Sequence, residues 1–125
     1  MAFAKKIENI KNDILGKKYS LSIAFVTEEK SREINKKYRR KDKATNVLSF
    51  ALGKNWGELV LCKAVIKKEA RLRLSASDGQ AKKIKDVYQD YLGFLVIHGM
   101  LHLKGMRHGK KMEKLEKKYL SRTKF

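Results

Sequence analysis

All three histidines of this chain lie in one short segment, His98-Gly-Met-Leu-His-Leu-Lys-Gly-Met-Arg-His108. His98 and His102 are four residues apart, so on an α-helix their side chains lie on the same face, one turn apart. If the helix continued, His108 would point roughly 120° away from His102. Gly105 provides an exit, because glycine readily adopts the left-handed conformation that ends helices. The spacing therefore predicts a helix ending near Gly105 and three imidazoles that meet beyond it.

Three converging histidines indicate a metal site. Imidazole is the commonest metal ligand in proteins, and catalytic zinc takes three protein ligands and keeps a fourth position for water. The alternative to a metal site is that the histidines have a structural role as packed residues of an apolar helix. A metalloprotease with this histidine spacing carries a general-base glutamate directly after the first histidine, and here that position is Gly99. We expect one zinc ion per chain, bound by His98, His102 and His108, with water as the fourth ligand.

The charge of the chain predicts its partners. Thirty-one lysines and arginines face 13 acidic residues, which gives a net charge of +18 over 125 residues. Such a balance favours polyanions, nucleic acid first, while a membrane surface is a weaker alternative because the charges are spread along the whole chain. Apolar runs are too short for a membrane helix, no apolar leader is visible, and the single cysteine fits a reducing compartment. We expect a cytoplasmic protein of one domain, residues 1–125, with no membrane association.

Hydrophobic spacing predicts alternating helices and short strands. Helices are expected at 3–16, 27–38, 65–74, 80–103 and 111–120, and strands at 19–26, 47–50 and 58–64. From Tyr91 onward the helix 80–103 is apolar nearly all round, so it should be the central buried helix. Gly93 and Gly99 inside it each cost about 1 kcal/mol relative to alanine. Tight packing, or close approach by a strand or substrate, would explain them.

Two segments together resemble the YbeY family of bacterial endoribonucleases. They are Tyr-Arg-Arg-Lys-Asp-Lys-Ala-Thr-Asn-Val-Leu-Ser-Phe at 38–50 and Ile-His-Gly-Met-Leu-His-Leu-Lys-Gly at 97–105 with His108. Residues 57–62, Gly-Glu-Leu-Val-Leu-Cys, are similar to the family's third signature, and the order of elements fits over roughly 18–120. The resemblance implies a single-domain α+β fold: a small mixed sheet, about five helices, and a zincin-like arrangement around a central metal-binding helix.

The same resemblance implies an activity and partners. It implies a zinc-dependent, single-strand-specific endoribonuclease that acts in maturation of the small-subunit ribosomal RNA 3′ end and in ribosome quality control. The family's zinc ligands match His98, His102 and His108, and its functional arginine matches Arg39. The implied partners are single-stranded RNA, above all ribosomal RNA, with ribosomal proteins and assembly GTPases as further candidates.

The chain also departs from the family pattern. Arg107 stands where aspartate usually precedes the third histidine, so one carboxylate that could orient a metal ligand is in doubt. Ala44 and Ala51 replace two usual prolines, and Gly-Lys-Lys at 109–111 replaces an acidic stretch. None of these changes removes a metal ligand, and the added positive charge could tighten RNA binding near the metal.

Several other side chains are candidates for catalysis or RNA binding, and each also has a purely structural alternative. Asp42 could act as a base or pair with basic neighbours, and Glu58 could act as a base or bond within the sheet. Tyr38 and Trp56 could stack bases or anchor the core or a loop. The other basic residues of the segment 36–43 are expected to steer the RNA backbone without sequence preference; they include Lys37, Arg40, Lys41 and Lys43. Thr45 and Asn46 are expected to fix the loop that carries Arg39.

The chemistry that fits these residues is metal-assisted phosphodiester cleavage. Arg39 would stabilise negative charge on phosphoryl oxygens, since guanidinium is planar, permanently charged and matched to phosphate. Either a water molecule or the RNA 2′-hydroxyl could attack. A ribosome- or RNA-binding assembly factor with structural zinc is the main competing class, although structural zinc sites are closed by four ligands and usually contain cysteine. A small metallopeptidase is the third class, and Gly99 counts against it.

Overall fold

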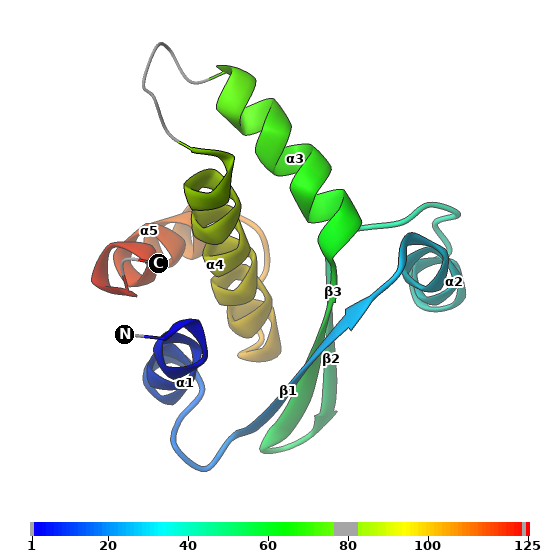
Figure 1. Cartoon of the computed structure of the whole chain (residues 1–125). Helices are drawn as coiled ribbons and strands as arrows, with labels where there is room; N and C mark the ends of the chain where they lie inside the picture. The colour runs from blue at the N-terminus through cyan, green and yellow to red at the C-terminus, as the bar shows by residue number, and fades with distance from the viewer. Residues whose placement is uncertain (1, 77–82, 124) are drawn as a thin grey trace.

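The structure is a computed structural model that describes residues 2–76, 83–123 and 125. Within these residues five helices and three strands follow one another along the chain (Figure 1). In chain order they are α1 (Phe3–Ile14), β1 (Ser20–Val26), α2 (Glu28–Arg39), β2 (Val47–Gly53), β3 (Trp56–Cys62), α3 (Lys63–Ala76), α4 (Ile84–Leu103) and α5 (Lys110–Thr123). The predicted α+β fold with about five helices is confirmed.

The three strands form one mixed sheet in the order β1-β3-β2. β3 runs parallel to β1 and antiparallel to β2, with which it forms a hairpin. As the central strand, β3 buries Leu59, Leu61 and Cys62 completely. β1 and β2 are the edges, and Phe25 on β1 is 45% exposed although it is in phase with the inward Leu21 and Ile23. The mixed sheet predicted from the family resemblance is confirmed.

Helix α4 is the centre of the molecule. It contacts α1, α3, α5, β2 and β3 (Figure 1), and between Tyr91 and Leu101 it buries side chains on all sides. α2 lies apart from this group and packs against β3. The prediction of a central buried helix is confirmed, while its expected first residues, 80–82, lie outside the described residues. None of the described helices has the length and apolar character needed to cross a membrane.

Both glycines inside α4 lie where another element comes close. A Cβ at Gly99 would come 2.6 Å from Cδ2 of the fully buried Leu59 and 3.1 Å from the Ser49 hydroxyl. A Cβ at Gly93 would meet the ring of Phe125. Of the explanations open from the sequence, close approach of a strand therefore holds at Gly99 and tight side-chain packing at Gly93.

Several element boundaries differ from the predicted ones. β2 continues to Gly53 and β3 begins at Trp56, so the turn between them is tighter than predicted. α3 begins directly after β3 and continues to Ala76, two residues beyond its predicted end at 74; residues 77–79, between the two predicted helices, lie outside the described residues. Arg39 is the last residue of α2 and not the first of the loop. Hydrophobic spacing locates the body of an element better than its ends, because element ends fray and their bounds depend on local capping geometry.

The contact at Gly99 predicts an asymmetry between the two glycines. We expect Gly99→Ala to lower the free energy of unfolding by about 1–3 kcal/mol, as overpacking a core site does. Gly93→Ala should lower it less, because the partly exposed Phe125 ring can move aside. Urea denaturation of both variants measures the difference. Helix propensity alone favours alanine by about 1 kcal/mol at each site, so a stabilised Gly99→Ala would contradict the packing argument.

Candidate metal centre and active site

The end of α4 turns the chain back toward its own histidines. Gly105 has φ of 100°, and its N–H donates to the carbonyl of His102 at 2.9 Å. The N–H of Met106 donates to the carbonyl of Leu101 at 3.0 Å. These two bonds form a Schellman motif, the helix ending that glycine at this position favours. The exit predicted at Gly105 is confirmed, and it carries the chain round to His108.

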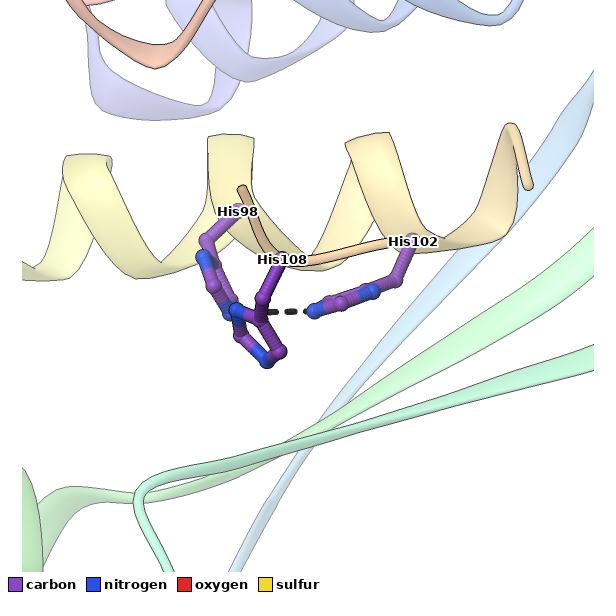
Figure 2. Close-up of side chains that lie close together, drawn as sticks. All are labelled: His98, His102 and His108. Atoms are coloured by element: carbon purple, nitrogen blue, oxygen red, sulfur yellow. Dashed lines mark hydrogen bonds between the residues drawn. The ribbon is translucent and has the colours of Figure 1, made fainter. Parts of the chain in front are cut away.

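The three imidazoles meet beside the part of α4 that carries His98 and His102 (Figure 2). One ligand nitrogen from each of His98, His102 and His108 lies within 4.8 Å of the other two. The ring centroids are 4.6 Å apart for His98 and His102, 5.0 Å for His98 and His108, and 4.7 Å for His102 and His108. The convergence predicted from the spacing is therefore present in the structure.

Hydrogen bonds fix how two of the rings present their nitrogens. Nδ1 of His102 lies 3.0 Å from the carbonyl oxygen of Met106, and Nδ1 of His98 lies 3.3 Å from the Glu116 carboxylate. A carbonyl or an ionised carboxylate can only accept, so both Nδ1 atoms carry the proton in this assignment. The Nε2 atoms of the two rings then face one another with lone pairs, 3.1 Å apart.

Two facing lone pairs repel unless a cation lies between them. A tetrahedral zinc ion with nitrogens at about 2.0–2.1 Å holds those nitrogens about 3.3 Å apart, close to the 3.1 Å observed. Burial lowers the pKa of His98 below its ordinary value, and the hydrogen bond to Glu116 offsets part of that effect. His98 is thus favoured in its neutral, metal-binding form. The residues present fit a three-histidine zinc site.

Glu116 is a site residue that the sequence analysis missed. It lies on α5, its side chain is 9% exposed, and it contacts His98 from the side away from the other imidazoles. Metal-bound histidines commonly donate their second N–H to a carboxylate, which fixes the ring and raises its basicity. The residue just before His108 is the exposed Arg107, so the carboxylate usual at that position in the family is absent. Helix α5 supplies a carboxylate to His98 instead, that of Glu116. Glu116 lies four residues after the buried Met112, and this helical spacing was the signal in the sequence that it faces inward.

The histidines open onto a cavity of about 720 Å³. The edge strand β2 forms one wall, and the last turn of α2 contributes another. Its lining comprises Tyr38, Arg39, Thr45, Asn46, Val47, Leu48, Ser49, Phe50, His98, His102 and His108. Arg39 therefore faces the same space as the histidines, although about sixty residues of sequence separate it from them.

Buried polar side chains of α2 hold the loop between Arg39 and β2. The Ser31 hydroxyl donates to the carbonyl of Thr45 at 3.0 Å and accepts from its N–H at 2.9 Å. The Asn35 amide donates to the carbonyl of Lys43 at 2.8 Å. Both Ser31 and Asn35 are almost fully buried. The expected loop-fixing role of Thr45 is therefore seen, and it acts through the backbone.

Asn46 fixes the end of the same loop through its side chain. Its amide donates to Glu69 at 3.0 Å and to the Tyr91 hydroxyl at 3.3 Å, and its Oδ1 accepts from the N–H of Val47. The Tyr91 hydroxyl in turn donates to Glu69 at 3.0 Å. Burial raises the pKa of Tyr91, which keeps this donor protonated. The loop is tied to α3 and α4, the elements that also support the histidines.

Three other candidates lie outside the cavity. Asp42 forms a bidentate pair with Arg32 at 2.6 and 3.1 Å, and this hydrogen bonding lowers the pKa of Asp42. Glu58 lies in the central strand opposite Ser22 and Phe50. Trp56 is 52% exposed and packs over Gly53 across the hairpin. Asp42 is therefore paired with a basic neighbour, Glu58 lies within the sheet, and Trp56 packs on the hairpin turn.

Comparisons with known proteins agree with this combination of fold and site, a small α+β protein with a three-histidine candidate metal centre. The family model described as Endoribonuclease YbeY matches residues 1–124. The chain is 35% identical over 120 residues to Endoribonuclease YbeY of Staphylococcus carnosus, covering 86% of this chain and 68% of that one. It is 40% identical over 96 residues to the Listeria monocytogenes protein of the same name, covering 70% and 60%. The chain belongs to the YbeY family.

A solved structure shows the same fold. The solution structure of TM1509 from Thermotoga maritima superposes with a TM-score of 0.61 at 27% sequence identity. The alignment covers 98% of this chain and 84% of TM1509. The order and packing of the elements described above are therefore shared with a solved protein.

The bond between Glu116 and His98 predicts an effect on metal affinity. Glu116→Gln keeps the size and an acceptor oxygen but removes the charge, so we expect zinc affinity to fall about tenfold, the lower end for such partners. Glu113→Gln on the exposed face of the same helix should leave it unchanged. Competition with a chromophoric chelator measures both. Equal affinities in the two variants would show that Glu116 does not orient His98.

Proposed function

We propose that this chain is a zinc-dependent endoribonuclease that cleaves single-stranded RNA, with residues 1–125 acting as one YbeY-like domain. The observation that carries the proposal is the shared cavity: three imidazoles and Arg39 face one space. Relatives that match over most of this chain bear the name Endoribonuclease YbeY. The net charge of +18 supports a polyanionic substrate.

The make-up of the cluster favours a catalytic over a structural zinc ion. Among the residues that the structure describes, the metal-binding group contains His98, His102 and His108 alone. Structural zinc takes four protein ligands, whereas catalytic zinc keeps an open position. Cys62 is fully buried in β3 and is not part of the group. The open side of the cluster faces the cavity, where a substrate could enter.

The residues divide the chemistry among them. When bound, zinc held by three neutral imidazoles keeps its full charge and supplies either an activated water or polarisation of a phosphoryl oxygen. Arg39 stabilises the charge that gathers on phosphoryl oxygens during cleavage. Glu116 and the Met106 carbonyl hold His98 and His102 in the tautomers that direct Nε2 to the ion. The exposed Lys37, Lys41 and Lys43 attract the RNA backbone.

We place this activity in ribosomal RNA maturation at the small-subunit 3′ end and in ribosome quality control, in the cytoplasm. The support is the resemblance of segments 38–50 and 97–108 to the family, together with the family match. Ribosomal proteins and assembly GTPases are the proposed protein partners. The two competing classes, an RNA-binding assembly factor with structural zinc and a small metallopeptidase, are outcomes of the first experiment below.

Loss of one imidazole should abolish metal binding and cleavage together. We expect His102→Ala to bind no stoichiometric zinc and to lose cleavage of a precursor small-subunit ribosomal RNA fragment that zinc-loaded wild type cleaves. Both proteins are compared at near-physiological salt, with bound metal quantified in the same samples. Cleavage that persists in the variant would expose a contaminating nuclease. RNA binding without cleavage by either protein would favour the assembly factor, and cleavage of a peptide library would favour the metallopeptidase.

Arg39 should matter for cleavage and not for folding or metal. We expect Arg39→Ala to retain zinc and a wild-type thermal transition while its cleavage rate falls about 10²–10³-fold, as when a transition-state donor is removed. Lys54→Ala is the matched control, since Lys54 is an exposed cation of the turn between β2 and β3 that does not line the cavity. Single-turnover kinetics on the same RNA measures the rates. Unchanged cleavage in Arg39→Ala would remove it from the mechanism.

A further inference from the structure

One exposed aromatic side chain lies in the candidate active site. Tyr38 is 60% exposed and lines the cavity that contains the three histidines and Arg39. The ring of Phe50 lies against it at 5.2 Å in an edge-on arrangement. The other exposed aromatic residues named above, Phe25 and Trp56, do not line this cavity. From the sequence, Tyr38 and Trp56 were equal candidates for base stacking, and only Tyr38 lines the cavity.

We propose that the ring of Tyr38, supported by Phe50, is a stacking platform for one nucleobase of the bound RNA, next to the phosphate that Arg39 contacts. This inference rests on the proposed function and adds the group that positions the substrate. Base stacking on aromatic side chains is the usual way in which proteins hold single-stranded nucleic acid without reading its sequence. A nucleobase can stack on this ring while the phosphates of the same strand contact the surrounding cations.

The position of the platform is fixed by the fold. Tyr38 lies in the last turn of α2, and Phe50 lies in β2, paired with Glu58 of the central strand. The Ser31 and Asn35 hydrogen bonds hold the loop that joins α2 to β2. Because the ring loses little freedom when a base arrives, stacking there is favoured over stacking on a mobile side chain.

The charges around the ring match a nucleic-acid strand. Six of the eight residues from 36 to 43 are basic, and Nζ of Lys37 lies 5.3 Å from the centre of the Tyr38 ring. Lys37 is a flexible surface side chain, so a base can take its place on the ring while the ammonium moves to a phosphate. An apolar peptide segment would gain nothing from these cations, which makes RNA the favoured occupant.

The platform gives a physical reason for single-strand preference. In a double helix each base is already stacked on its neighbours and paired, so it cannot reach a protein ring without being flipped out. A single strand offers unstacked bases at little cost. Tyr38 therefore selects substrates whose bases are free on at least one side of the cleaved phosphate.

Binding of a non-cleavable strand tests the proposal. The ligand is a 2′-O-methyl RNA oligonucleotide, and affinity for the zinc-loaded protein is measured by fluorescence anisotropy. We expect Tyr38→Leu to weaken binding about tenfold, within the range for loss of one base stack, while Tyr38→Phe and Tyr38→Trp bind like wild type. Phe25→Leu is the matched control: Phe25 is exposed and has Lys63 over its ring at 4.6 Å, but lies outside the cavity.

A second ligand separates stacking from damage to the fold. An oligonucleotide of the same length with abasic residues keeps the phosphates and removes the bases, so wild type and Tyr38→Leu should bind it equally. Equal weakening on both strands, or wild-type affinity of Tyr38→Leu for the full strand, would overturn the stacking role. If the wild type cleaves RNA and Tyr38→Leu binds normally, this inference fails alone. If wild type neither binds nor cleaves RNA, the proposed function fails with it.

Discussion

The contact between α4 and the sheet at Gly99 is the constraint on which the site depends. Because this residue has no side chain, Leu59 and the Ser49 hydroxyl come against the helix backbone, and that hydroxyl donates to the Gly99 carbonyl at 3.2 Å. Gly99 lies between His98 and His102 in the same turn of helix. The closeness of helix and strand therefore sets where both imidazoles stand relative to β2, the strand that forms the cavity wall.

Two other supports converge on the same cavity from separate parts of the chain. The Schellman turn at Gly105 returns His108 to the helix end and offers the Met106 carbonyl to His102. The loop after Arg39 is tied by Ser31 and Asn35 to α2 and by Asn46 to α3 and α4. Catalytic geometry tolerates little displacement, and here His102 and the loop after Arg39 are each held by part-buried hydrogen bonds.

Local sequence pattern shows some features of this fold and not others, for physical reasons. Helix periodicity located the body of α4 and its buried character, and the glycine signal located its end. Phe25 follows Leu21 and Ile23 at strand spacing, yet it is exposed while they are half-buried, and local pattern does not show which end of a strand the rest of the fold covers. Glu116 was missed because a carboxylate among lysines of an amphipathic helix resembles any surface charge. Its burial against His98 depends on how α5 packs on α4.

The sequence by itself determined that three imidazoles would meet beyond the end of one helix, because residue spacing and a left-handed glycine act over a single turn of chain. It also determined a strongly cationic surface, since net charge is a sum that folding does not change. Only the tertiary structure decided that Arg39 and Tyr38 line one cavity with the histidines, that Trp56 does not, and that the Glu116 carboxylate contacts His98. These relations join residues that are distant in sequence, and only the packing of helices on the sheet brings them together.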